Sequence, residues 1–468
     1  MTQPLPLTPF EEYMLCDDRP AHPMTGFFRL RFSGRLERPS LEAALRLAVS
    51  RHPLTHCKVQ SCGGKLAWVP DDGFSLKLEC CTATPDRQYP RAGAMDLTAA
   101  AGTRCWLVER PEGHDLVVQM HHSVTDALGM CQFIEDVLLE YARLTGTAEA
   151  GLQLREMDES KLPGRNKFGL TWGQLLRLLP RQMIGLLGAR QALMRRPSRL
   201  LPECEDSSDT ARSPGETAGC FPSPRTFVFS PGETREILQA AKRRKVTVND
   251  LLARDLFLAV GELRKRAACE TPRDWLRFSV PMNLRTPDDE RLSVANVVSM
   301  IFLDRRPADL DDADKLLRSI QDEMQLIKRN RLSLTFVLSL AVARLFPGGV
   351  RKMVPDNRCW ATAIFSNLGV IFTNTPLPRR DGKLLLGDVT LDELDFVTPL
   401  RPHTAAACCI YTYAGRLFVM MHCDPRSLSD GQTDELMAGY VARIRESIHT
   451  GSVAQSPNAE MSAATCPS

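Results

Sequence analysis

The sequence predicts a mixed α/β protein, an α/β fold with mixed sheets of the α+β type, that forms two related lobes. Three observations support this prediction. The chain has 468 residues, 43% of them hydrophobic and 25% charged, which is enough apolar material for two cores. Strand patterns and amphipathic helix patterns alternate in both halves. A polar stretch rich in Ser, Gly and Pro separates the halves at residues 203–224.

Residues 1–150 are expected to form the N-terminal lobe. Thr8 and Glu11 have the spacing of a capping box, so a helix is expected to start there. The apolar positions in 40–52 and 129–144 recur at helical spacing and predict two amphipathic helices. Strands are expected at 26–34, 103–110 and 115–121, with short strands within 58–78.

Residues 151–224 are expected to hold a crossover helix followed by a flexible linker. The part from 168 to 201 is rich in Leu, Met and Arg, but Arg and Pro interrupt each apolar run before it reaches the roughly 18–20 residues of a membrane span. Two interpretations remain open. The helix either packs on the lobes, or it is a basic amphipathic helix that contacts a membrane or a lipid substrate.

Residues 225–450 are expected to form the C-terminal lobe, and residues 451–468 a disordered tail. Ser230 is expected to cap a helix, and Asn249 or Asp250 to stand at the start of a helix over 248–266. Further helices are expected at 309–329 and 430–448, and strands at 225–230, 275–285, 295–304, 361–369, 405–415 and 416–424.

Composition excludes several function classes. The net charge of +3, from 59 basic and 56 acidic residues, gives no reason to expect a nucleic-acid partner. The fifteen cysteines contain no CxxC pair, only the neighbours Cys80-Cys81 and Cys408-Cys409, which point to opposite faces of a strand. We therefore expect reduced cysteines, no metal site and no bound cofactor. The start of the chain lacks the pattern of a signal peptide, which favours a cytoplasmic location.

The strongest functional signal is the run HHSVTDALG at residues 121–129. Two histidines end a predicted strand, an aspartate follows the second by four residues, and a helix comes next. Strand alternation sends His121 and His122 to opposite sides, so only one of them can face a substrate. A neutral imidazole suits removal of a proton from an alcohol, amine or thiol near pH 7. Asp126 can orient a histidine or pair with a cation that holds the loop.

This run resembles the HHxxxDG motif of the chloramphenicol acetyltransferase-like superfamily. That group includes condensation domains of nonribosomal peptide synthetases, wax ester and diacylglycerol acyltransferases, alcohol acetyltransferases and polyketide-associated acyltransferases. Three further segments resemble family patterns in the same order. They are the RH of residues 51–52, SVPMNLR at 279–285 with the following VANVVS, and FSNLG at 365–369. The resemblance spans residues 5–450 and departs from the motif at Ala127, where the family has Gly.

The resemblance implies two lobes of the same fold with an active-site tunnel between them, which the acyl thioester and the acceptor enter from different sides. His122 corresponds to the family's general base, with His121 beside it. Asp126 corresponds to a structural aspartate that pairs with an arginine. Arg285, across the lobes, is the first candidate for this partner and Arg51 the second.

Three further residues of the matched segments, Ser366, Asn367 and Ala127, bear on the site that the resemblance implies. Ser366 and Asn367 could donate hydrogen bonds to the oxyanion or the acceptor, or could only stabilise a strand end. If the motif glycine requires a positive φ, Ala127 costs about 1 kcal/mol and is where a loss of activity would originate.

The implied activity is that of an acyltransferase for groups other than aminoacyl groups, in secondary or lipid metabolism. Acyl-CoA or an acyl-carrier protein would be the co-substrate, and a small alcohol or amine the acceptor. No GxSxG elbow, P-loop or dinucleotide fingerprint occurs in the sequence. Two alternatives stay open: a carrier-dependent condensation enzyme, and a catalytically inactive binding or scaffold protein of the same fold. We expect a monomer.

Overall fold

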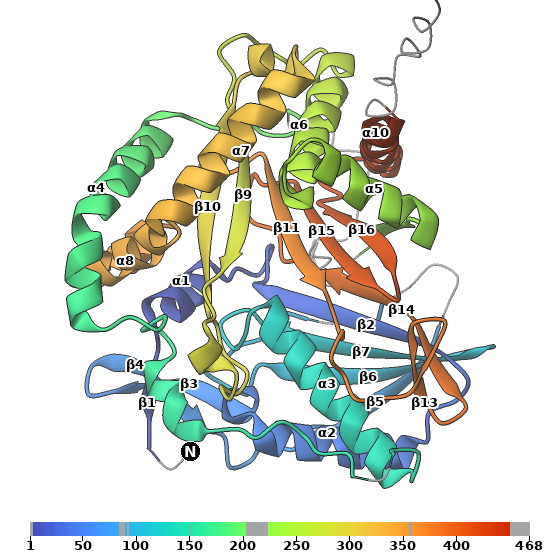
Figure 1. Ribbon diagram of the computed structural model, residues 1–468. Coiled ribbons are helices and arrows are strands. Elements are labelled where there is room, and N and C mark those ends of the chain that lie inside the picture. The colour runs from blue at the N-terminus through green and yellow to red at the C-terminus, as the bar shows by residue number, and fades with distance from the viewer. Residues whose placement is uncertain are drawn as a thin grey trace, which may run out of the picture.

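The computed structural model describes residues 3–83, 89–90, 93–149, 151–202, 223–354 and 358–449. The expected tail at 451–468 and most of the expected linker lie outside the described residues. The described chain forms a lower and an upper lobe, each built on a large mixed sheet with helices packed against it (Figure 1). The mixed α/β class expected from the sequence is confirmed.

The strands are β1 (Leu5–Pro6), β2 (Thr25–Ser33), β3 (Cys57–Cys62), β4 (Lys65–Pro70), β5 (Leu78–Thr82), β6 (Thr103–Arg110), β7 (Gly113–His121), β8 (Arg225–Val228), β9 (Leu276–Asn283), β10 (Val298–Arg305), β11 (Ala363–Val370), β12 (Arg379–Arg380), β13 (Lys383–Leu386), β14 (Val389–Val397), β15 (Ala406–Tyr413) and β16 (Arg416–Cys423). The helices are α1 (Pro9–Asp17), α2 (Arg38–Arg51), α3 (Ala127–Leu144), α4 (Trp172–Met194), α5 (Pro231–Arg243), α6 (Val248–Arg266), α7 (Ala313–Asn330), α8 (Leu334–Ala343), α9 (Gly349–Lys352) and α10 (Asp430–His449).

The lower lobe contains a seven-stranded sheet in the order β12-β13-β14-β2-β7-β6-β5, and α2 and α3 pack together on it. The apolar face expected for the helix at 40–52 is buried in the core of this lobe. Thr8 and Glu11 form the expected capping box at the start of α1. A separate three-stranded sheet, β1-β4-β3, lies beside this lobe.

The upper lobe contains a six-stranded sheet in the order β10-β9-β11-β15-β16-β8, flanked by α5, α6, α7 and α10 (Figure 1). Ser230 caps α5 as expected. The cap of α6 is Thr247, not Asn249 or Asp250, because Asp250 instead closes a capping box with Thr247. Cys408 and Cys409 point into different hydrophobic clusters, as their neighbouring positions on β15 require.

One segment of the second half of the chain returns to the lower lobe, which the expected lobe boundaries did not include. Strands β12, β13 and β14 come from the second half of the chain but belong to the lower sheet, where β14 pairs antiparallel with β2. A bulge between Leu391 and Glu393 shifts the pairing register, so the sequence of β14 lacks a simple alternating pattern. The expected C-terminal lobe at 225–450 therefore includes an arm that completes the N-terminal sheet.

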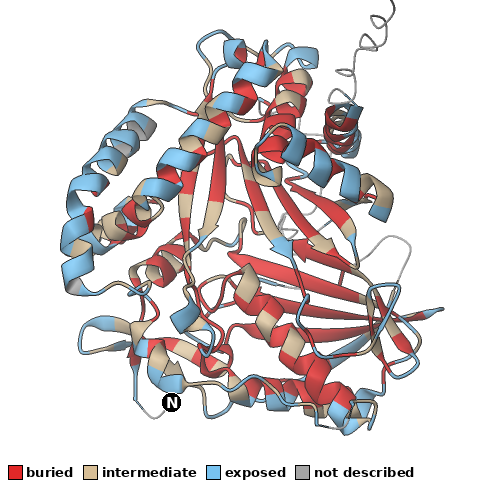
Figure 2. Ribbon diagram, in the orientation of Figure 1, coloured by how far each residue is buried: buried red, intermediate tan, exposed pale blue. Residues whose placement is uncertain are grey.

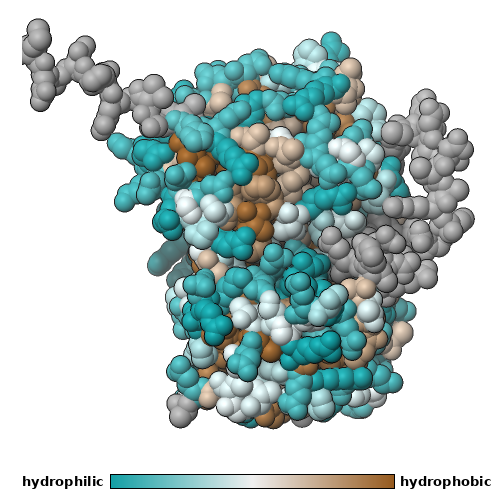
Figure 3. Space-filling model, turned by 90° about the vertical axis from the view of Figure 1, so that its right-hand side faces the viewer, coloured by the Kyte–Doolittle hydropathy of each residue, from teal (hydrophilic) through white to brown (hydrophobic). Residues whose placement is uncertain are grey.

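Helix α4 lies along the outer side of the molecule next to α8 (Figure 1). A capping box between Thr171 and Gln174 starts this helix. Most of its surface is exposed (Figure 2). The face opposite α4, at the right-hand side of Figure 1, is largely hydrophilic, with smaller apolar areas in its upper and lower halves (Figure 3). Within the described residues, no helix combines the length and apolarity needed to cross a membrane.

Candidate functional site

His122 lies at the turn between β7 and α3, where the edges of the two large sheets meet. Its backbone N–H donates a hydrogen bond of 2.7 Å to the carbonyl of Met24. The side-chain amide of Asn296 donates to the carbonyls of His122 and Ser123, at 2.8 Å each. These bonds fix the backbone of the turn from both lobes, since Met24 precedes β2 and Asn296 precedes β10.

His121 points away from the pocket that His122 lines. It is fully buried, and its Nδ1 accepts a hydrogen bond of 3.0 Å from the backbone N–H of Ser123. Its Nε2 lies 3.4 Å from a carboxylate oxygen of Asp18. Of the two histidines, His122 therefore lines the pocket and His121 holds the turn.

The His122 imidazole is set up to be neutral at pH 7. Burial lowers its pKa from the ordinary value of 6.5, and this effect outweighs the nearby charge of Asp126, which acts in the opposite direction. Within the described part of the chain, the buried Nδ1 has no hydrogen-bond partner. Because Nδ1 is buried, Nε2 is the ring nitrogen that can meet a substrate in the pocket.

Asp126 holds the loop together. Its carboxylate accepts bonds from the N–H of Gly129 at 2.9 Å, the N–H of Val297 at 2.8 Å and Nη1 of Arg285 at 2.8 Å. Burial alone would raise the pKa of Asp126, but the Arg285 guanidinium and the two N–H groups hold it below 3.8. The expected cross-lobe partner Arg285 is confirmed. The second candidate, Arg51, instead contacts Asp136 at 2.8 Å.

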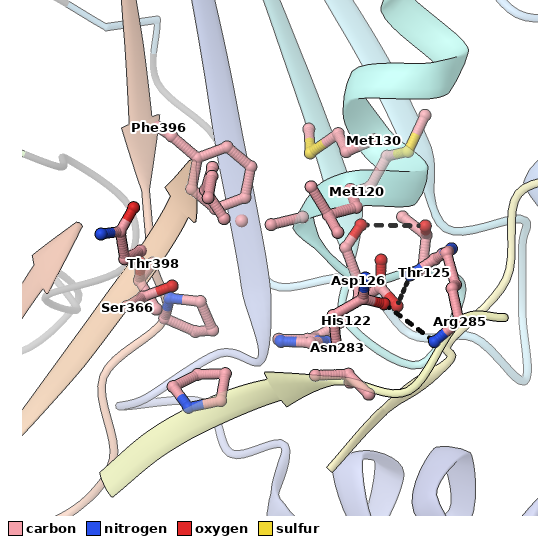
Figure 4. Close-up of a pocket in the computed structure, with 18 residues that line it drawn as sticks. Met120, His122, Thr125, Asp126, Met130, Asn283, Arg285, Ser366, Phe396 and Thr398 are labelled. Atoms are coloured by element: carbon pink, nitrogen blue, oxygen red, sulfur yellow. Dashed lines mark hydrogen bonds and ion pairs between the residues drawn. The ribbon is translucent and has the colours of Figure 1, made fainter. Parts of the chain in front are cut away.

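The pocket beside His122 collects strand ends of both sheets, and its cavity volume is about 90 Å³. Ser366 and Asn367 of β11 line the pocket, and Ser366 lies across it from Asp126 and Arg285 (Figure 4). The amide oxygen of Asn367 accepts the N–H of Gly369 at 2.8 Å, so that oxygen has a role within its own strand end. The structure thus brings His122, Asp126, Arg285, Ser366 and Asn367 to one pocket.

A second, larger cavity of about 690 Å³ lies next to the first. Val298 lines both cavities, and the rings of Phe10 and His122 meet edge to face at 6.4 Å between centroids. Apolar side chains form most of its wall, and seven of them belong to α1, α4 and α8. The lining residues are Thr8, Pro9, Phe10, Asn166, Lys167, Phe168, Leu170, Thr171, Leu175, Asn296, Val298, Leu334, Val337, Leu338 and Ala341.

The expected strain at Ala127 is absent. Ala127 is the first residue of α3, directly after the cap residue Asp126, and its φ is not positive. Alanine is a favourable helix residue, so the departure from the motif costs nothing in backbone conformation. Close approach occurs at Gly129 instead, where an added Cβ would lie 2.2 Å from the hydroxyl oxygen of Thr125.

Asn296 is the residue of this site that the sequence did not single out. It is 3% exposed and lines the larger cavity, and its amide oxygen has no partner in the described part of the chain. The signal was present, since an asparagine interrupts an otherwise apolar segment, VANVVS, that matches a family pattern. Its distance of more than one hundred residues from His122 in the sequence concealed the contact.

Comparison with known proteins supports the relationship that the motifs indicate. Residues 294–441 match the family described as the WS/DGAT C-terminal domain. An uncharacterized protein of Mycobacterium tuberculosis is 26% identical over 392 residues, which cover 79% of this chain and 84% of that protein. The same values hold for its counterpart in a second strain of that organism.

Several solved structures share the whole fold. The first condensation domain of the CDA synthetase is 14% identical with a TM-score of 0.67, covering 95% of this chain and 96% of that one. The epimerization domain from the third module of tyrocidine synthetase B is 13% identical with a TM-score of 0.65, covering 96% of this chain and 97% of that one. Polyketide synthase associated protein 5 from Mycobacterium tuberculosis is 12% identical with a TM-score of 0.62, covering 95% of this chain and 100% of that one. The two-lobed fold expected from the sequence is confirmed by these structures, and the match of residues 294–441 relates the C-terminal part of the chain to the WS/DGAT C-terminal domain.

Proposed function

We propose that this chain, with its two-lobed acyltransferase and condensation fold, transfers an acyl group from a thioester to an alcohol or amine, with His122 as the general base. The observation that carries the proposal is the placement of His122. Its imidazole lines the smaller pocket and contacts Phe10 of the larger cavity, its pKa is lowered by burial, and its loop is tied to the other lobe through Asp126 and Arg285.

The proposed reaction needs no covalent acyl-enzyme. The acceptor oxygen or nitrogen bonds to the thioester carbonyl carbon while its proton passes to Nε2 of His122. The carbon–sulfur bond then breaks, and the thiolate takes the proton from the imidazolium and leaves as a free thiol. General base catalysis contributes about 10²–10⁴-fold, and the positioning of both substrates supplies much of the rest.

The two cavities support separate entry of the two substrates. The smaller pocket opens between the strand ends of both sheets and is lined by polar groups such as Ser366 and Thr398. In this proposal Ser366 donates a hydrogen bond to the developing oxyanion. The larger cavity has a mainly apolar wall, which suits the aliphatic chain of an acyl group or of a long alcohol. Acyl-CoA and an acyl-carrier protein both supply the required thioester.

A carrier-dependent condensation reaction is the second candidate, because the structural neighbours include condensation domains of peptide synthetases. An inactive binding protein of the same fold is the third candidate, and the normal helical conformation of Ala127 gives no support to it.

The test is a thiol-release assay on the purified chain. Short-chain and long-chain acyl-CoA are offered with alcohols and amines, and the same acyl groups are offered on an acyl-carrier protein. The His122→Ala variant is compared with His449→Ala, which alters an exposed histidine at the end of α10. Acceptor-dependent release that is lost in the first variant and kept in the second is expected.

Three outcomes decide between the candidates. Release that survives His122→Ala contradicts the role of His122. Turnover with the carrier-bound thioester alone favours the condensation reaction. No turnover with either donor contradicts the proposed function.

A further inference from the structure

Helix α4 uses one side to pack on the protein. Leu178 and Gln182 are buried, and the side-chain oxygen of Gln182 accepts a hydrogen bond of 2.8 Å from the hydroxyl of Thr335. Gly185 lies against the same residue, where an added Cβ would be 2.0 Å from the Thr335 hydroxyl oxygen. This packing fixes which side of α4 faces outward.

The outward side is a continuous apolar stripe. We call it the α4 outer face, formed by Leu176, Leu179, Met183, Leu187 and Met194. These positions are spaced so that they share one side of a helix. Their exposed fractions are 62%, 49%, 58%, 59% and 72%, respectively. A surface helix of a globular protein normally turns such a stripe toward the core, so this one is exposed in a way that marks a contact surface.

The charged residues of α4 all have one sign. The segment from Ser160 to Pro202 contains nine Lys and Arg residues and no Asp or Glu, while the whole chain carries only +3. Two of the nine, Arg165 and Arg195, pair with Glu11 and Asp304 within the protein. Arg177, Arg181 and Arg190 are exposed on α4 itself. A basic helix with an apolar stripe, too interrupted to span a bilayer, has the properties of a helix that lies in the membrane interface.

We propose that the α4 outer face docks this protein on an anionic lipid surface, with the stripe in the headgroup region and the arginines on the lipid charges. The stripe runs over about 27 Å at the rise of an α-helix, which suits a flat lipid surface better than a compact protein patch. This docking is independent of the reaction proposed above.

The α4 outer face lies beside the larger cavity, so docking would also affect substrate supply, a consequence that rests on the proposed function. Leu175 of α4 and Leu338 and Ala341 of α8 line the larger cavity. Just past them along α8 and its end, Val342, Leu345 and Phe346 are 56%, 80% and 64% exposed. A docked protein therefore holds the rim of its apolar cavity near the source of aliphatic substrates.

The test is flotation of the full chain with phosphatidylcholine vesicles, with and without phosphatidylglycerol. The variant Leu179→Asp/Leu187→Asp removes the stripe, and Arg177→Glu/Arg181→Glu reverses the charge. Leu238→Asp on α5, which is 50% exposed, is the matched control. Each altered side chain is exposed, and circular dichroism checks that every variant is folded.

We expect the wild type and Leu238→Asp to float with anionic vesicles, less so at high salt. Both α4 variants should bind on the order of tenfold more weakly or worse. Turnover of a short-chain soluble thioester should stay unchanged, which separates docking from catalysis. Wild-type binding that equals that of the stripe variant overturns the proposal, as does equal binding to vesicles without phosphatidylglycerol. A wild-type dimer that the stripe variant converts to a monomer also overturns it, because the occupant is then a second copy.

Discussion

Replacement of Asp126 by alanine should destabilise the fold strongly, because this carboxylate links three separate parts of the structure. It caps α3 through the N–H of Gly129, accepts the N–H of Val297 before β10 and pairs with Arg285 after β9. The variant leaves the guanidinium of Arg285 without this partner and leaves two buried N–H groups without acceptors. The first contact lies in the lower lobe and the other two belong to the upper lobe.

The expected loss follows from the burial of the pair. The side chains of Arg285 and Asp126 are 18% and 6% exposed, respectively. Removal of one partner from a buried ion pair costs about 3–5 kcal/mol. Loss of the helix cap costs about 1 kcal/mol, but the two effects overlap because one carboxylate makes both contacts. We expect Asp126→Ala to lower the free energy of unfolding by about 3–5 kcal/mol, and Asp126→Asn by less, since its amide oxygen can still cap α3.

Urea unfolding monitored by tryptophan fluorescence measures this loss. The control is Glu435→Ala, which breaks an ion pair with Arg266 whose side chains are 37% and 58% exposed. An exposed pair contributes about 0–1 kcal/mol, so the control should unfold almost like the wild type. A loss below about 1 kcal/mol for Asp126→Ala, no larger than in the control, would refute the view that this carboxylate ties the lobes together.

Three further substitutions test the surroundings of His122. Ala127→Gly should lower the free energy of unfolding by about 0.5–1 kcal/mol in urea without raising turnover, because Ala127 is a helical residue; a rise in activity would restore the idea of a strained loop. Asn296→Leu should cost about 1–3 kcal/mol and lower kcat more than it raises KM, since two carbonyls lose their donor; unchanged kcat in a folded variant would remove Asn296 from the positioning of His122. Ser366→Ala should lower kcat by about 10²–10³-fold if the hydroxyl stabilises the oxyanion, whereas an unchanged kcat with lower stability would leave it only a strand-end role.

The sequence predicted the parts of this structure that depend on local pattern or on a linear motif. The capping box at Thr8 follows from its spacing to Glu11. The helix from Val248 to Arg266 and the strand pair before His122 follow from side-chain periodicity. The ion pair of Asp126 with Arg285 followed from motif order alone. Periodicity remains readable there because each of these elements has one packed face and few interruptions.

Features that depend on contacts between distant segments could not be predicted. Strand β14 contains a bulge, so its apolar and polar residues do not alternate regularly. Its place in the lower sheet is defined by its pairing with β2, which the sequence does not show. Helix α8 is apolar around most of its circumference, so it has no helical period to detect. The hydrogen bond from Asn296 to the carbonyl of His122 joins residues 174 positions apart in the sequence, and local sequence patterns do not predict contacts over such a separation.

The central claim is that a neutral His122 removes the proton of the acceptor, and the pH dependence of kcat/KM tests it most directly. Because burial lowers the pKa of this imidazole below 6.5, activity should rise with pH through an apparent pKa below 6.5 and stay level around neutrality. In His122→Ala this rise should disappear together with about 10²–10⁴-fold of the rate. A rate that rises only well above pH 7, or an acid limb that survives the substitution, would contradict the claim.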